Sequence, residues 1–202
     1  MHRRFILLLS CIMVSANVAS AATNNGKFAA YSVGAQPCSV VLQAYAGTDR
    51  AKALLEVSSW LSGYISGLNR LKEDTYDATP IMDHASLTLL TLRICEKNPK
   101  QLYESVANAM IESFSSISSR EEVGGVTIES GGQIVRLRTS AIKKLQLILV
   151  DQGYLKVSRA DGIYGKNTSS AITAWQEKNA LEKTGNFDTL TVFMLLQSKK
   201  NK

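Results

Sequence analysis

Two short motifs in the C-terminal half contain side chains of the type used in nucleophilic acyl transfer. Ser140 and Lys143 are three residues apart, so on a helix they lie on the same side and the lysine could activate the serine hydroxyl. A second lysine and hydroxyl follow in Lys183-Thr184-Gly185. Enzymes that combine such motifs use a far larger fold to hold them beside an oxyanion hole. We therefore predict that this chain is not an enzyme.

Other catalytic and metal-binding chemistries have few candidate residues. Beyond residue 21 the chain has one histidine, His84, which cannot build a histidine-rich zinc site and is expected at the surface or in a helix cap. Glu73, Asp74 and Asp77 lack the loop spacing of an EF-hand and are expected to form a solvated connection. We predict no metal site and no cofactor.

The first 21 residues have the pattern of a secretory signal. A basic start, Met1-His2-Arg3-Arg4, precedes the apolar run from Phe5 to Met13, and small residues follow at Ala19–Ala22. A lipoprotein processing site at Cys11 and an uncleaved anchor helix are the alternatives, but apolar residues continue well beyond Cys11. We predict a periplasmic, wall-associated protein with no membrane span after signal removal.

Two cysteines, Cys38 and Cys95, remain beyond that signal. An even number of cysteines in a chain sent to an oxidising compartment favours a disulfide. This pairing would leave no free thiol for nucleophilic catalysis. It would also stabilise a domain too small to depend on its core alone.

Composition and charge divide the chain in two. Hydrophobic residues make up 45% and charged residues 20%, as in soluble globular proteins. A Ser- and Gly-rich stretch, 115–133, predicts a linker between domains at 22–114 and 134–202. Residues 22–133 hold 9 Lys and Arg against 12 Asp and Glu, a net charge of −3, whereas 134–202 hold 12 against 5, a net charge of +7. Nucleic acid is nevertheless an unexpected partner for an exported chain.

The N-terminal domain is predicted to be helical. Apolar residues between Leu54 and Leu68 recur at steps of three and four, which indicates an amphipathic helix. Thr79-Pro80 and Asn98-Pro99 each have the pattern of a helix start. Within the first helix, Gly63 and Gly67 predict that a neighbouring helix packs closely over them.

The C-terminal domain is predicted to contain three short helices around one core. The first is expected over 134–150, where apolar residues step by four from Leu137. The second is expected over about 167–178, with Trp175 in the core, and the third follows the turn Thr184–Asp188. The predicted fold class is therefore all-α, with two small helical domains, the first of them joined by a disulfide.

The order of motifs in the second half resembles the peptidoglycan-binding domain family that accompanies many cell-wall enzymes. It includes Leu145-Gln146, Gly153-Tyr154, the loop Asp161–Thr168, Ala171–Gln176 and Thr184-Gly185 with Asp188. The family carries Phe where this chain has Trp175, and commonly Pro where it has Lys166. The resemblance implies a three-helix fold and peptidoglycan as partner. The candidate binding residues that it implies are Asp161, Gly162, Tyr164, Gly165, Thr168 and Gln176.

The first half is similar to small disulfide-bonded helical proteins related to the periplasmic acid-stress chaperones HdeA and HdeB. The resemblance rests on the helix Trp60–Asn69, on the acidic stretch Asp74–Asp77 and on the two cysteines. It implies a helical fold and, in the chaperones proper, acid-triggered binding of client proteins. Periplasmic immunity proteins that neutralise wall-degrading toxins have a comparable helix and provide an alternative.

These patterns together predict a non-catalytic exported protein. Its C-terminal domain would bind peptidoglycan, and its N-terminal domain would present a surface to a protein partner. Two other functions stay open: an acid-stress chaperone or toxin-neutralising protein, and a cell-wall hydrolase with an unrecognised catalytic domain.

Overall fold

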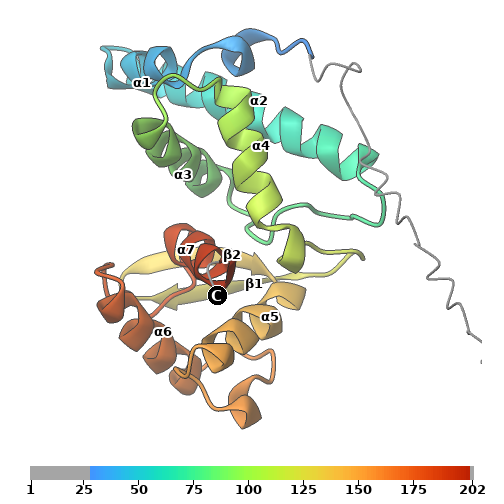
Figure 1. Cartoon of the computed structure of the whole chain (residues 1–202), viewed down its shortest axis with the longest axis vertical. Coiled ribbons are helices and arrows are strands. Elements are labelled where there is room, and N and C mark those ends of the chain that lie inside the picture. The colour runs from blue at the N-terminus through green and yellow to red at the C-terminus, as the bar shows by residue number, and fades with distance from the viewer. Residues whose placement is uncertain (1–27, 201–202) are drawn as a thin grey trace, which may run out of the picture.

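Seven α-helices and one two-stranded sheet make up residues 28–200, the part of the chain that the computed structural model describes (Figure 1). The mostly helical fold predicted from the sequence is confirmed. The predicted signal, residues 1–21, lies outside the described residues. Among the described helices, none is both long and apolar enough to cross a membrane. The helices are α1 (Cys38–Ala46), α2 (Arg50–Leu71), α3 (His84–Lys97), α4 (Tyr103–Ser113), α5 (Thr139–Asp151), α6 (Lys166–Lys178) and α7 (Thr189–Lys200), with single 3-10 turns η1 (Ser32–Ala35), η2 (Ser115–Ile117) and η3 (Val157–Arg159).

The predicted disulfide is confirmed, and it joins α1 to α3. Cys38 is the first residue of α1, and Cys95 lies in the last turn of α3, with their Cα atoms 5.1 Å apart. Both residues are fully buried. For a sequence separation of 57 residues, the loop-entropy model gives a stabilisation of about 4 kcal/mol.

Helix α3 begins later than its sequence pattern indicates. Its cap is Asp83, whose carboxylate accepts from the backbone N–H groups of Ala85 and Ser86, so the start predicted at Thr79-Pro80 is wrong. The hydroxyl of Thr79 instead contacts the carboxylate of Asp77 at 3.3 Å. Residues 79–82 are extended because their backbone is bonded to a strand of the sheet and is therefore not free to enter a helix.

Helix α4 also begins beyond its predicted start. The side chain of Asn98 donates to the carbonyl of Ile94 and so ends α3 instead of capping α4. Residues 99–102 then pair with the segment before α1, since Cys38 N–H donates to the Gln101 carbonyl at 2.8 Å. These bonds hold the chain extended until α4 begins at Tyr103.

The two glycines of α2 are not covered by a neighbouring helix. A Cβ atom built at Gly63 or at Gly67 meets no atom within 4 Å. The prediction of a close helix contact over these glycines is therefore wrong. Gly63 instead lies at the edge of a cavity beside Trp60 and Tyr64, whose rings stack with centroids 5.1 Å apart.

The segment 115–133, for which composition predicts a linker, is built into the fold. It contains η2 and the first strand of an antiparallel hairpin, β1 (Gly125–Ser130) with β2 (Gln133–Arg138). Gly131 and Gly132, both with positive φ, form the two-residue turn that such hairpins favour. The division into domains stays a prediction, because one continuous core contains residues from both sides of this segment.

Strand β2 occupies the start of the region predicted as a single helix over 134–150. Val135 and Leu137 are buried while Ile134 and Arg136 are exposed, which is the two-residue period of a strand. Helix α5 begins at Thr139, directly after the strand. The stripe of apolar residues at steps of four holds only from Ala141 onward.

A buried ion pair joins the two halves at this junction. Arg138 bonds the Asp77 carboxylate through Nη2 at 2.8 Å and through Nε at 2.9 Å, and Asp77 is 7% exposed. Arg138 Nη1 also donates to the Val123 carbonyl, and the guanidinium lies over the Tyr76 ring. Asp77 and Ser119 exchange backbone hydrogen bonds in an isolated bridge. Loop 76–82, the hairpin and α5 are therefore held at one point.

Helix α7 completes the junction by packing on α3 and α4 (Figure 1). Phe114, at the end of α4, meets Phe193 of α7 edge to face, with ring centroids 6.5 Å apart. Phe114 is fully buried. The two halves therefore share an apolar interface as well as an ion pair.

We expect Arg138→Ala to lower the free energy of unfolding by about 2–4 kcal/mol, because it leaves the Asp77 carboxylate buried without its partner. Arg120→Ala is the matched control, because Arg120 pairs with Asp74 at an exposed site and should contribute less than about 1 kcal/mol. Urea unfolding followed by circular dichroism measures both. Equal losses in the two variants would show that the buried pair does not hold the halves together.

Candidate functional site

The first loop of the C-terminal half is organised by one buried glutamine. The side-chain carbonyl of Gln146, on α5, accepts from the backbone N–H of Gly162 at 2.7 Å. Its amide nitrogen donates to the carbonyl of Ile163 at 3.0 Å and to the hydroxyl of Thr168 at 2.9 Å, and it lies 3.4 Å from the Asp161 carboxylate. Because Gln146 and Thr168 are both buried, this network fixes the shape of the loop from within.

The second loop is organised in the same way by Gln176 of α6. Its carbonyl accepts from the Gly185 N–H at 2.9 Å, and its amide nitrogen donates to the hydroxyls of Thr184 and Thr191 at 2.8 and 2.9 Å. Asp188 accepts from both threonine hydroxyls and from the backbone N–H of Thr191, and so caps α7. Gln176 is fully buried, so its candidate role in binding peptidoglycan would be to hold this loop in shape.

The two loops are structural repeats of one another. In each loop, a helix glutamine accepts a hydrogen bond from a glycine N–H and donates one to the hydroxyl of the threonine six residues after that glycine. Gly162 and Gly185 both have positive φ, 85° and 63°, which an L side chain rarely adopts. The repeat is hidden in the sequence because each glutamine lies at a different distance from its glycine.

The remaining candidate residues lie on the first loop. Tyr164 donates from its hydroxyl to the Gly185 carbonyl at 2.7 Å and so links the two loops. Gly165 is exposed and caps α6. The pKa of the exposed Asp161 is lowered mainly by the backbone N–H of Ile163, and further by the amide of Gln146 and by the charge of Arg159. Its carboxylate is therefore ionised at neutral pH.

The hairpin covers the second loop but leaves the first one open. Ser130 Oγ donates to the Thr184 carbonyl at 2.9 Å, and a Cβ built at Gly131 would lie 2.6 Å from Thr184 backbone atoms. The hairpin turn therefore packs directly on the second loop. On the first loop, by contrast, Ile163 is 70% exposed. The hairpin therefore leaves the outer face of the first loop uncovered.

The first-loop face, defined here as Val157, Ile163, Lys143, Arg159 and Lys166, combines apolar and cationic side chains. Val157 is 72% exposed, and all three cations are exposed. Lys143 Cβ lies 3.5 Å from a Cβ built at Gly162, and the charge of Arg159 acts on Asp161, so both flank the loop. Such a surface suits a ligand that carries both anionic groups and apolar carbon.

Ser140 and Lys143 do not bond one another, and the residues of the second motif make other contacts. The Ser140 hydroxyl is buried and has no hydrogen-bond partner among the described residues, so Lys143 does not bond it. The Lys183 ammonium pairs with Glu177 at 3.2 Å on the surface. The hydroxyl of Thr184 belongs to the Gln176 network. The prediction that the chain is not an enzyme stays a prediction.

His84 is the first residue of α3, where its ring bonds a neighbouring helix. Nδ1 lies 2.6 Å from the hydroxyl of Ser62 on α2. The side chain is exposed, as the sequence indicated, while the capping role belongs to Asp83. Within residues 28–200, no group of three or more His, Cys, Asp or Glu side chains is arranged to hold a metal ion.

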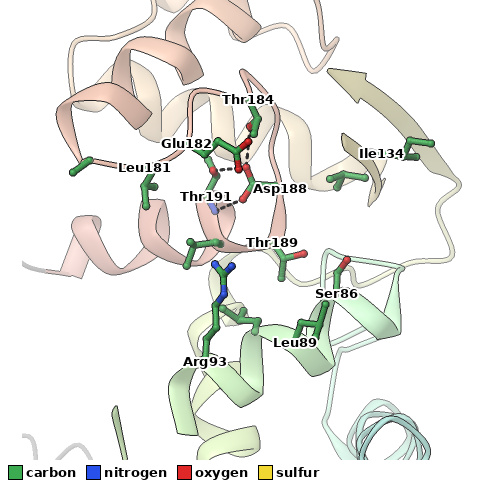
Figure 2. Close-up of a pocket in the computed structure, with 14 residues that line it drawn as sticks. Ser86, Leu89, Arg93, Ile134, Leu181, Glu182, Thr184, Asp188, Thr189 and Thr191 are labelled. Atoms are coloured by element: carbon green, nitrogen blue, oxygen red, sulfur yellow. Dashed lines mark hydrogen bonds between the residues drawn. The ribbon is translucent and has the colours of Figure 1, made fainter. Parts of the chain in front are cut away.

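A cleft of about 440 Å³, which no sequence pattern indicated, lies between the two halves. We call it the seam cleft. One wall is α3, and the other consists of β2 and the segment from Ala180 to Thr191 (Figure 2). Figure 2 shows Arg93 extending from α3 across the cleft toward the C-terminal half. Because the walls are far apart in sequence, no local pattern could have predicted the cleft.

The C-terminal half is thus a three-helix module whose two loops are held by buried glutamines and whose first loop is open. Residues 138–195 match the model of a family described as a putative peptidoglycan binding domain. This confirms the resemblance inferred for the second half, so the C-terminal region is a helical domain of that family. Helices α1–α4 lie outside the match. No curated protein and no solved structure matches the chain.

We expect Gln176→Ala to lower the free energy of unfolding by about 2–4 kcal/mol, because it leaves the Gly185 N–H and two threonine hydroxyls without their buried partner. Gln43→Ala on α1 is the control, because Gln43 is exposed and should change stability by less than about 0.5 kcal/mol. Chemical unfolding monitored by tryptophan fluorescence compares them. A loss for Gln176→Ala no larger than for Gln43→Ala would contradict the assigned role of the network.

Proposed function

We propose that this chain is an exported, non-catalytic protein that binds peptidoglycan through residues 134–202. The observation that carries the proposal is the family match over 138–195, which spans both glutamine-held loops. Peptidoglycan is a polymer of sugars with short peptides that bear carboxylates. The first-loop face is where this chain offers exposed groups of matching chemistry.

Two properties of the first-loop face support this ligand. Residues 134–202 carry a net charge of +7, which attracts a polymer rich in carboxylates. The side chains of Val157 and Ile163 are exposed and can cover apolar carbons of a sugar or peptide. Since Gln146 fixes the loop backbone, little conformational entropy is lost when a ligand binds there.

The N-terminal half is proposed to contact a protein partner in the periplasm. A cavity of about 420 Å³, bordered by Trp60, Gly63 and Tyr64, opens on this half, and the stretch 28–31 forms its other side. Glu104 accepts from the Tyr64 hydroxyl at 2.7 Å, and burial together with this bond raises the pKa of Tyr64. A cavity with aromatic walls, whose polar group Glu104 is already hydrogen-bonded, resembles the pockets that receive anchor side chains in protein interfaces.

We expect the double substitution Lys143→Glu with Arg159→Glu to weaken co-sedimentation of the full chain with purified sacculi by about tenfold or more, because both cations flank the first loop. The matched control is Lys97→Glu with Lys100→Glu, which makes the same change in net charge on the N-terminal half. Binding is measured at low and high salt to separate general attraction from local contact.

Equal losses in both double variants would mean that net charge, not the first-loop face, drives binding. Failure of the unsubstituted chain to sediment with sacculi would contradict the proposed function itself. Zymography on wall material tests the non-catalytic part separately, and a cleared zone would contradict it.

A further inference from the structure

The seam cleft is formed by both halves of the chain, so it is not a property of the matched family alone. Ser86, Leu89 and Arg93 on α3 form one wall, outside the residues that match the family model. The opposite wall comes from the segment that Gln176 organises, including Glu182 and Leu190. The two walls are held together by the backbone bonds between loop 76–82 and the hairpin and by the packing of α7 on α3.

Two opposite charges without partners line this cleft. Arg93 makes no ion pair or side-chain hydrogen bond with any described residue, and the Glu182 carboxylate likewise has none. Asp188, the third charged residue of the cleft, is already hydrogen-bonded within the C-terminal half. Its two carboxylate oxygens accept from Gln176, Thr184 and Thr191. Arg93 and Glu182 are therefore the groups that a ligand can reach.

Apolar side chains also line the cleft, beside hydroxyl groups such as that of Ser86. Leu89 is 44% exposed and Ile134 is 68% exposed, and both line the cleft together with Leu181 and Leu190. A ligand that carries a carboxylate, an amine and apolar carbon would complement these groups. Short peptides have this combination of groups, whereas sugars alone lack both charges.

We propose that the seam cleft binds the stem peptide of peptidoglycan, with a peptide carboxylate on Arg93 and a free side-chain amine on Glu182. This inference rests on the proposed function and adds a second contact region for the same polymer. The first-loop face and the seam cleft involve different segments of the C-terminal domain. A strand of peptidoglycan that reaches both would be held by contacts from both halves of the chain.

The test measures binding of a soluble stem peptide that carries free carboxylates and a free side-chain amine but no sugar. Isothermal titration with the full chain should show a dissociation constant about tenfold or more higher for Arg93→Gln. Arg70→Gln is the matched control, because Arg70 is an exposed arginine on α2 that makes the same charge change away from the cleft. Unfolding midpoints verify that both variants keep the fold.

Chemical variants of the peptide assign each contact. Amidating the carboxylates should weaken binding to the unsubstituted chain but cause little further loss in Arg93→Gln, as in a double-mutant cycle. Acetylating the amine should behave in the same way with Glu182→Gln. Additive losses in either cycle would overturn the corresponding contact.

The inference and the proposed function fail differently. If the unsubstituted chain sediments with sacculi but does not bind the peptide, or if Arg93→Gln binds it as Arg70→Gln does, the seam cleft is not a peptide site while the proposed function stands. If the unsubstituted chain binds neither sacculi nor peptide, both are overturned.

Discussion

The ion pair between Arg138 and Asp77 is the constraint on which the arrangement of this molecule depends. Arg138 ends β2 directly before α5, and Asp77 lies in the loop that connects α2 with α3. The two side chains are only 17% and 10% exposed, so removing one charge would leave the other unpaired in a poorly solvated place. The same loop bonds Ser119 on one side and β2 on the other. Position and orientation of the C-terminal helices relative to α3 follow from this junction.

The repeated glutamine networks give the C-terminal domain two loops of similar shape but different accessibility. Gln146 and Gln176 satisfy buried backbone and hydroxyl groups that would otherwise be costly to bury. The hairpin packs on Thr184 of the second loop, whereas Ile163 on the first loop stays exposed. The same hairpin, by placing β2 opposite α3, forms part of the seam cleft. The hairpin in front of the three-helix module thus covers part of one loop and forms part of one wall of the cleft.

Local sequence patterns predicted most of the helices, but not where α3 and α4 begin, nor the features that depend on distant partners. The apolar periodicity of α2 and the motif order of the C-terminal domain were sufficient, because each lies within one segment. The hairpin was missed because Gly131 and Gly132 match a linker composition as well as a tight turn. Leu137 fitted the stripe of α5 by its spacing alone, although it lies in β2.

The binding role of the six candidate residues stays a prediction, and the structure places some of them inside the molecule. Thr168 and Gln176 are buried, and the Tyr164 hydroxyl is bonded to a carbonyl. A sequence motif identifies the residues that form a loop, whereas the exposure of those residues depends on the segments that pack over the loop. The hairpin has no counterpart in the motif. The exposed cations that flank the first loop and the cleft between the halves therefore required the fold to be known.

Two independent domains would each keep their structure when separated. In this fold, by contrast, the two halves share a core and a buried ion pair. A cut after residue 133 would separate β2 from β1 and leave Arg138 without Asp77. Isolated halves therefore report on damaged structures, and point substitutions in the full chain are the sounder probe. Since α7 packs on α3 and α4, the disulfide that fixes α1 to α3 also steadies one wall of the seam cleft. The loops of the C-terminal half and the helices of the N-terminal half are consequently joined through one shared core.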